Sequence, residues 1–250
     1  MSFFSKENPP NYFINTNKFN CFLSHGLHPM YVHENWISNN GIINHVEIEK
    51  DINLFHEILA RHLNIIYAIG ETGFDLSKEI LNHPKCKFST KKNLIDIQSI
   101  AFETCINAAI KYDLPIILHL RAPWQLCMQK IRWAKNEGIK NIMIHCYSGS
   151  AEELKNLSKL SVYCSFGGVP TWKKSIKNRN AFVKCDPLLR LLETDSPDLP
   201  PEIPNFEKLI ENEPGNLKEI AQILAPYLNI SDIELIKSSN ENTLRFLGLD

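Results

Sequence analysis

The sequence lacks the short patterns that are typical of several enzyme and binding-protein classes. It has no C-x-x-C pair, which argues against a zinc knuckle or a thioredoxin-type site. It also has no G-x-S-x-G, P-loop or G-x-G-x-x-G, so serine hydrolase and nucleotide-binding functions are not indicated. No apolar run approaches the ~18 residues of a membrane span, and the start MSFFSKENPP lacks the apolar core of a signal peptide. We therefore expect no membrane association.

Neither charge nor cysteine usage points to a specialised environment. Lysine and arginine (27) nearly balance aspartate and glutamate (28), so a nucleic-acid partner would have to be bound by a local basic patch. The seven cysteines are scattered, and several lie in apolar runs such as 162–166. They are typical of reduced core thiols, and we expect a cytoplasmic protein.

Length and composition are those of an ordinary globular domain. The 250 residues are 44% hydrophobic and 22% charged, which is enough to bury a sizeable core. Because α/β barrels commonly need ~200–250 residues, we expect one domain spanning 1–250 rather than two.

Short apolar runs alternate with segments of helical period along the chain. We expect strands at 20–24, 65–69, 115–118, 141–144, 161–166 and 188–192. Apolar residues spaced three and four apart predict helices over 94–112 and 217–228, and Ser231 with Glu234 predicts a capping box for a last helix. Residues 72–90 lack periodicity and are predicted to be a long loop. This order is typical of repeated βα units and a parallel sheet.

Ionisable residues follow four of the predicted strands. Glu71 comes after YAIG, His119 after PIIL, His145 after NIMI and Asp195 after RLLET. The carboxyl ends of parallel strands meet at one face, where active sites form, so the four side chains are predicted to cluster. Each alone could be an ordinary hydrogen-bonded residue. Together, two imidazoles and two carboxylates suit Zn²⁺ or a similar ion that activates water, which predicts a hydrolase.

Seven strings carry a resemblance to a known family. They are GLHP (26–29), AIGETGFD (68–75), LPIILHLR (114–121), IHCYSGS (144–150), FGG (166–168), LLETDSP (191–197) and NTLRF (242–246). In this order they resemble the successive motifs of the TatD family of metal-dependent deoxyribonucleases. The resemblance covers roughly residues 20–249.

The resemblance implies a TIM-type (β/α)₈ barrel that binds one or two divalent ions (Zn, Mg or Mn) and hydrolyses DNA. It implies that Glu71 bridges two metals and that His119 and His145 complete one metal's shell. Asp195 would serve the other metal and orient the attacking water. The resemblance also places Arg121 and Ser148 at a phosphate, which a forked guanidinium and a hydroxyl can bind.

The sequence departs from the family at its N-terminal end. The family opens with an H-x-H strand, but no histidine occurs before His25, and about six of the eight strands are recognisable. His25 and His28 are three residues apart, so on an extended strand they point to opposite faces and are not expected to chelate one ion together. We expect His28 to line the mouth of the site or to have a structural role.

Three explanations of this departure stay open. Glu71, His119 and His145 with a water could suffice for one ion. Alternatively, the natural start lies upstream, or the chain is a degenerate member that binds without turnover. A barrel without two strands exposes sheet edges, so we expect either a segment such as 12–16 or a protein partner, including a second copy, to cover the gap.

A basic stretch, 172–184, follows the FGG strand. It carries Lys173, Lys174 and three further basic residues with no acid, and it includes Trp172 and Phe182. It could hold a phosphate backbone and stack a base, whereas a solvated helix face is the ordinary alternative. Cys146 is expected to be a buried thiol facing away from His145, because neighbours on a strand point in opposite directions.

The sequence thus predicts an α/β, TIM-type barrel and a metal-dependent hydrolase that cleaves DNA. Glu71, His119, His145 and Asp195 are the predicted metal ligands, with Glu71 and Asp195 also catalytic. Arg121, Ser148, His28, Lys173 and Lys174 are the predicted substrate contacts. The alternatives are a non-catalytic binding protein on the same scaffold, and a metal-dependent enzyme that hydrolyses another ester or an amide.

Overall fold

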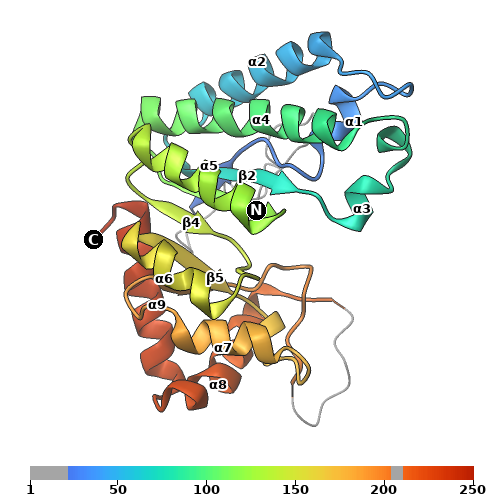
Figure 1. Cartoon of the computed structure of the whole chain (residues 1–250). Helices are drawn as coiled ribbons and strands as arrows, with labels where there is room; N and C mark the ends of the chain where they lie inside the picture. The colour runs from blue at the N-terminus through green and yellow to red at the C-terminus, as the bar shows by residue number, and fades with distance from the viewer. Residues whose placement is uncertain (1–21, 204–210) are drawn as a thin grey trace. The chain divides into compact units, whose positions relative to one another are not determined.

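A computed structural model describes residues 22–203 and 211–250. The chain forms two compact units that meet in sequence between Lys140 and Asn141 (Figure 1). The predicted covering segment 12–16 lies outside the described residues.

The first unit contains three parallel strands in the order β1, β2, β3. They are β1 (Leu23–His25), β2 (Ile66–Asp75) and β3 (Ile116–Arg121). The register pairs Ser24 with Ala68 and Gly73 with His119. A Cβ atom at Gly73, where φ is +141°, would lie 2.2 Å from the carbonyl oxygen of His119, so glycine allows the two strands to approach here.

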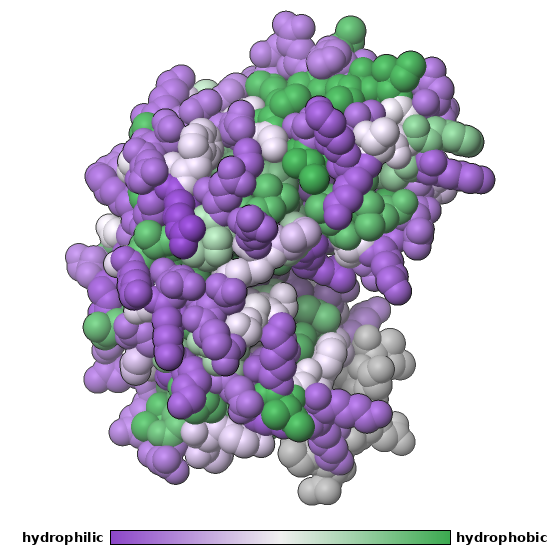
Figure 2. Space-filling model, in the orientation of Figure 1, coloured by the Kyte–Doolittle hydropathy of each residue, from purple (hydrophilic) through white to green (hydrophobic). Residues whose placement is uncertain are grey.

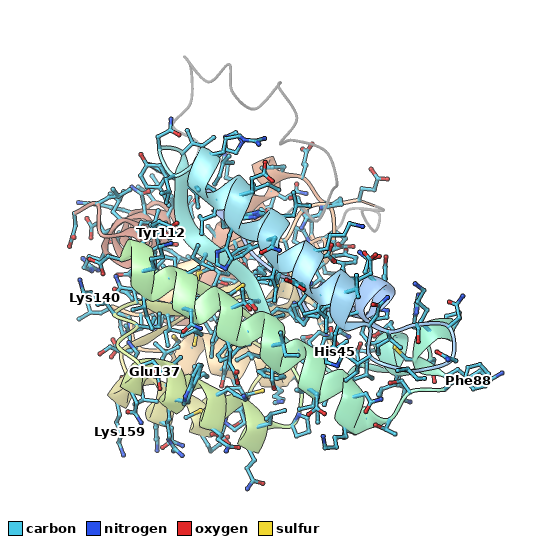
Figure 3. The ribbon with its side chains drawn as sticks, turned by 90° about the horizontal axis from the view of Figure 1, so that it is seen from above. His45, Phe88, Tyr112, Glu137, Lys140 and Lys159 are labelled. Carbon is cyan, nitrogen blue, oxygen red and sulfur yellow. The ribbon has the colours of Figure 1, made fainter. Side chains whose placement is uncertain are left out.

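Helices flank these strands. They are α1 (Val32–Trp36), α2 (His45–Arg61), α3 (Lys78–Leu81), the 3₁₀ turn η2 (Pro84–Cys86), α4 (Lys91–Tyr112) and α5 (Trp124–Asn136). The predicted apolar stripe of α4 is buried from Leu94 to Ala109 and packs on β2. Figures 1 and 3 show α2 and α4 side by side, and Figure 2 shows apolar side chains gathered over these helices.

The prediction of a long loop over 72–90 is wrong. Strand β2 continues for ten residues through Asp75, and the rest of the segment contains α3 and η2. The register between β2 and β3 shifts after Ile69 and then resumes from Thr72 to Asp75. The motif ETGFD is therefore strand rather than loop, because pairing with β3 extends it beyond its apolar start.

The second unit repeats the pattern. Its parallel strands are β4 (Ile142–Ile144), β5 (Val162–Phe166) and β6 (Arg190–Leu192), in this order. Its helical elements are α6 (Ala151–Lys159), η3 (Val169–Thr171), α7 (Ile176–Lys184), η4 (Pro214–Asn216), α8 (Leu217–Leu224), η5 (Ala225–Leu228) and α9 (Asp232–Leu247). Parallel strands alternate with helices in both units, which confirms the α/β class.

The last helix, α9, is defined by specific contacts at its start and along its buried face. The predicted capping box is present, with both reciprocal bonds between Ser231 and Glu234. Asn242, which is 1% exposed, donates to the carbonyl oxygens of Pro187 (2.8 Å) and Arg190 (2.7 Å). These bonds dock α9 against β6. Among the described helices, none has the length and apolar character needed to cross a bilayer.

Candidate metal centre

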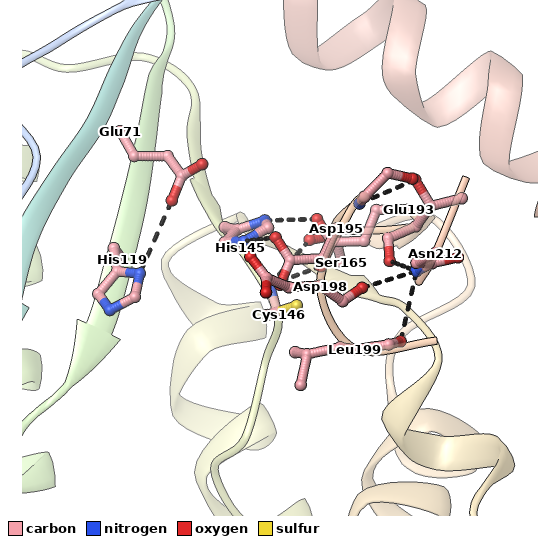
Figure 4. A network of polar contacts seen from close by, with 12 residues as sticks. Glu71, His119, His145, Cys146, Ser165, Glu193, Asp195, Asp198, Leu199 and Asn212 are labelled. Atoms are coloured by element: carbon pink, nitrogen blue, oxygen red, sulfur yellow. Dashed lines mark hydrogen bonds and ion pairs between the residues drawn. The ribbon is translucent and has the colours of Figure 1, made fainter. Parts of the chain in front are cut away.

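The first unit brings Glu71 of β2 together with two imidazoles. His28 Nε2 lies 3.1 Å from Glu71 Oε2, and His119 Nδ1 lies 3.7 Å from the same oxygen (Figure 4 shows Glu71 and His119). One potential ligand atom from each of the three residues lies within 4.8 Å of the others. An imidazole and a carboxylate at this spacing suit a borderline divalent ion.

Asp75 binds the ring nitrogen of His119 that is turned away from Glu71. His119 Nε2 donates to Asp75 Oδ2 at 2.9 Å, and Ser77 N donates to Asp75 Oδ1 at 2.7 Å. Burial raises the pKa of Asp75, but these hydrogen bonds outweigh burial and lower that pKa to about 2. The carboxylate is therefore ionised and fixes the ring so that Nδ1 faces Glu71. Metal-binding histidines typically have such a carboxylate on their other nitrogen.

The ring of His119 is itself placed between two carboxylates. Burial lowers the pKa of His119, but the hydrogen bonds to Asp75 and Glu71 outweigh burial, and the pKa is raised. The space between His119 Nδ1 and the Glu71 carboxylate therefore favours a positive charge. Either a proton on Nδ1 or a bound metal ion can provide this charge. The side chains of the first unit therefore fit a divalent ion.

His28 and His25 have different surroundings. His28 Nδ1 accepts from Met30 N at 3.1 Å, so its Nε2 carries the proton and donates to Glu71. His25 stacks on the ring of Phe55 with centroids 5.0 Å apart. Of His25 and His28, only His28 lies beside Glu71, as expected for two residues spaced three apart on an extended chain. In this tautomer His28 orients Glu71.

The second unit forms another group around His145, which follows β4. His145 Nδ1 lies 2.5 Å from Glu193 Oε2, and His145 Nε2 lies 3.0 Å from Asp195 Oδ1 (Figure 4). Burial lowers the pKa of His145, but the charge of Glu193 and the bond to Asp195 raise it well above its ordinary value. As in the first unit, two carboxylates beside one imidazole favour a positive charge at the ring, from a proton or from a metal ion.

Glu193 is a functional candidate that sequence reasoning left unassigned. Its Oε1 accepts from Cys146 N at 2.6 Å while its Oε2 faces His145. Strand β6 ends at Leu192, so Glu193 and Asp195 both lie in the segment just beyond it, and both carboxylates reach the ring of His145. The signal available in the sequence was two acids immediately after a predicted strand.

The expectation that Cys146 faces away from His145 is wrong. The Sγ atom of Cys146 lies within 4.8 Å of ligand atoms of His145 and Glu193. Strand β4 ends at Ile144, and Cys146 has a φ of +45°, which turns its side chain out of the alternating pattern. Asp195 also has a positive φ, +62°. Such backbone outliers cluster at functional sites.

The loop that carries Asp195 is held by Asn212. This buried amide donates to the carbonyl oxygens of Thr194 and of Asp198, the latter at 2.8 Å (Figure 4). Asp198 N in turn donates to Asp195 O at 2.8 Å. These contacts hold the backbone of the loop on both sides of Asp195.

Four of the predicted substrate contacts lie at the surface, whereas the fifth, His28, is buried, and both of its ring nitrogens are already bonded within the first unit. Arg121 ends β3 and lies 3.4 Å from Glu79 and 3.9 Å from Asp75. Ser148, Lys173 and Lys174 are exposed. Lys177 Nζ donates to Ser148 O at 3.0 Å, which joins the basic stretch to the segment after β4.

The suggestion that the basic stretch stacks a base on its aromatic residues is wrong for Phe182. Phe182 is 0% exposed and packs in the core. Trp172 is half-buried, and its Nε1 donates to Pro200 O at 2.9 Å. Arg179 is also engaged, since Nη1 donates to the carbonyl oxygens of Pro170 and Trp172 at 2.9 Å each. Lys173 and Lys174 are the exposed cations that precede α7.

Comparison with known proteins identifies the family. The family model described as TatD related DNase matches residues 11–248. The chain belongs to this family. This TatD-family chain is 29% identical over 202 residues to the uncharacterized metal-dependent hydrolase YabD of Bacillus subtilis (strain 168), covering 81% of this chain and 72% of the relative. It is 31% identical over 234 residues to the uncharacterized metal-dependent hydrolase BU355 of Buchnera aphidicola subsp. Acyrthosiphon pisum (strain APS), covering 89% and 76%.

A solved structure extends the comparison to the fold. The crystal structure of YJJV, a TatD homolog from Escherichia coli K12, matches with a TM-score of 0.72 at 21% identity. The match covers 96% of this chain and 80% of that chain. The predicted TIM-type α/β fold of the TatD family is thereby confirmed. The family assignment makes the class a metal-dependent hydrolase, which is the class that the strand-end residues predict.

Proposed function

We propose that this TatD-family protein hydrolyses phosphodiester bonds of DNA with a divalent metal ion. The observation that carries the proposal is the repeated placing of one imidazole between two carboxylates. His119 lies between Glu71 and Asp75, and His145 lies between Glu193 and Asp195. The description of the matching family, TatD related DNase, supports DNA as the substrate.

The proposed ligands are Glu71 and His119 in the first unit and His145 and Asp195 in the second. Metal-dependent hydrolase relatives and the donor set support a metal cofactor. When bound, a divalent ion lowers the pKa of water to about 7 and polarises a phosphoryl oxygen. Asp75 and His28 would hold the ligands His119 and Glu71 in place through the bonds described above.

The remaining steps fall to side chains of this chain. Asp195, the more exposed of the two acids on His145, would orient the attacking water or take its proton, with side-chain exposure of 26% against 15% for Glu193. Arg121 is half-exposed at the end of β3 and would bind a phosphate oxygen of the substrate. Ser148, Lys173 and Lys174 would contact the phosphate backbone.

A nuclease assay with matched variants tests this proposal. The metal-stripped protein should not cleave labelled DNA, and Zn²⁺, Mg²⁺ or Mn²⁺ should restore cleavage. Glu71→Gln and His119→Ala should reduce the rate to background, whereas His45→Ala, an exposed histidine outside both groups, should retain it. Full cleavage by His119→Ala would contradict the proposal.

Two other functions are distinguished by the same protein preparations. The relatives are named metal-dependent hydrolases without a substrate, so an ester or amide hydrolase on this scaffold is a second candidate. Metal-dependent turnover of model esters with intact DNA would favour it. Metal-free protein that binds DNA without turnover would favour the non-catalytic alternative.

We also propose that the protein works in the cytoplasm and that a partner or a second copy covers an open sheet edge. The six cysteines in the described part of the chain are free thiols, which suits a reducing compartment. Fractionation of cells tests the location. Light scattering of the purified chain tests self-association, since a monomer at micromolar concentration contradicts the second copy.

A further inference from the structure

A second group of metal-ligand side chains lies in the first unit, apart from Glu71 and His119. His33 is on α1, His83 immediately precedes η2, and Cys86 ends η2. One potential ligand atom from each lies within 4.8 Å of the other two. The rings of His33 and His83 meet edge to face, with centroids 4.4 Å apart and planes at 78°.

His33 has no hydrogen-bond partner within the described part of the chain. His33 is 1% exposed, and both of its ring nitrogens are buried without a hydrogen bond. A buried polar atom that has lost its bonds to water and found none in the protein is destabilising, so native proteins rarely keep two such atoms on one ring. His28 is different, because its two nitrogens are matched by Met30 N and Glu71. The orphaned ring points to a missing ligand.

We propose that His33, His83 and Cys86 bind a thiophilic divalent ion of the Zn²⁺ type. Two imidazoles and a thiolate form a ligand set for Zn²⁺, and the thiolate disfavours Mg²⁺ and Mn²⁺. His83 is half-buried, so a water molecule can take the fourth position. This site is independent of the proposed nuclease function, since none of its three residues belongs to the His119 or His145 groups.

Loading the site requires two local proton shifts. The S–H bond of Cys86 breaks, a sulfur–metal bond forms, and the proton leaves to solvent. His83 Nδ1 now accepts from Lys85 N at a long 3.3 Å, so ligation through Nε2 moves the ring proton to Nδ1 and gives up this contact. The Lys85 ammonium is directed to the carbonyl oxygen of Glu34.

The position of the site suggests what it does. It joins α1 to the segment between α3 and α4, and only α3 separates this segment from the strand that carries Glu71 and Asp75. Within the described residues, few other hydrogen bonds join α1 to this segment. One of them is the bond from the Lys85 ammonium to the carbonyl oxygen of Glu34. A bound ion would therefore tie this segment to α1 and stabilise the folded first unit.

Co²⁺ provides a direct test on the full chain, because a thiolate bound to Co²⁺ gives a near-ultraviolet charge-transfer band that imidazole and carboxylate ligands do not. We expect metal-stripped protein to develop this band with one equivalent of Co²⁺. Cys86→Ser should abolish it, and Cys127→Ser, which removes another buried thiol, should keep it. Circular dichroism of each variant confirms that it is folded.

Two further variants make the outcome decisive. Cys146→Ser removes the thiol beside His145, so loss of the band in this variant instead of Cys86→Ser would overturn the proposal. His83→Gln, at a half-buried position that tolerates change, should weaken Co²⁺ binding at least about tenfold as judged by titration of the band. Absence of any band in the wild-type chain would also overturn the proposal.

Discussion

His119 Nε2 lies 2.9 Å from Oδ2 of Asp75, a carboxylate that is 0% exposed and separated from it by 44 residues. The bond joins neighbouring strands, since Asp75 ends β2 and His119 lies within β3. It leaves Nδ1 of the same ring directed to Glu71. Asp75 is therefore a positioning residue for the candidate metal centre.

Replacing Asp75 with asparagine should weaken metal binding. The amide keeps the size of the side chain but removes the charge that orients the His119 ring, and loss of such a partner typically costs 10–100-fold in affinity, or about 1.4–3 kcal/mol. Competition with a chromophoric chelator measures the affinity. The exposed helical acid Asp96 provides the control, because Asp96→Asn removes a charge outside the site. Equal affinities of the two variants would contradict the role of Asp75.

Glu193→Gln should lower the pKa of His145 and reduce activity. The charge of Glu193 is the main contribution that raises this pKa, so the neutral amide should bring it back toward its ordinary value. Nuclear magnetic resonance titration of the ring protons of His145 in the metal-free protein measures the change. Glu241→Gln on the exposed face of α9 should leave the titration unaltered. An unshifted His145 in Glu193→Gln would show that the pair does not form in solution.

His25 should make the protein less stable in mild acid. Burial lowers the pKa of His25 to about 4, from about 6.5 in the unfolded chain. The unfolded state thus binds more protons between these values, so stability is lost as the pH falls from about 6.5 to about 4. This group alone accounts for up to about 3 kcal/mol.

Urea denaturation at pH 7.5 and at pH 5 checks this prediction. His25→Gln should unfold with a smaller difference in free energy between the two pH values than the wild-type chain. His45→Gln, at an exposed position, should retain the wild-type difference. An unchanged pH dependence in His25→Gln would mean that another group is responsible.

Charge reversal at Lys173 and Lys174 should weaken DNA binding and flatten its salt dependence. Each lysine that contacts a phosphate of duplex DNA contributes about 0.9 to the slope of log affinity against log salt concentration. The double variant Lys173→Glu/Lys174→Glu should therefore lose up to about 1.8 of this slope. Fluorescence anisotropy at several salt concentrations provides the measurement.

A matched double variant distinguishes loss of the contact between these lysines and DNA from a general effect of the change in net charge. Lys218→Glu/Lys237→Glu makes the same change in charge at exposed positions on α8 and α9. It should retain more of the slope than the first double variant. If both variants behave alike, the basic stretch is a solvated surface, which is the ordinary alternative for such a sequence.

Much of the fold could be predicted because it depends on local periodicity. The stripe of α4 and the capping box of α9 involve residues within one helix, and both are present. Segment 72–90 could not be predicted in this way, because β2 is extended by pairing with β3, which is distant in sequence. The local apolar pattern predicts where β2 starts, whereas pairing with β3 determines where it ends.

The residues of the candidate site likewise fall into those that local sequence pattern could predict and those that it could not. The grouping of Glu71 with His119 could be inferred from the order of apolar runs, although both lie within their strands rather than after them. The role of Asp75 could not, because its segment is predicted to be a loop rather than the end of β2. The roles of Glu193 and Cys146 could not, since both lie beyond a strand, where alternation of side chains no longer applies. Beyond β4 and β6, the backbone torsions at Cys146 and Asp195 decide which side chains meet.

The sequence by itself determined that strands and helices alternate, that the motifs belong to the TatD family, and that imidazoles and acids come after successive apolar runs. Only the tertiary structure decided that Asp75 holds His119, that Glu193 holds His145 across 48 residues, and that His33 is left without a partner. The reason is that a hydrogen bond between distant segments depends on strand register and on backbone torsions, which residue order alone does not specify.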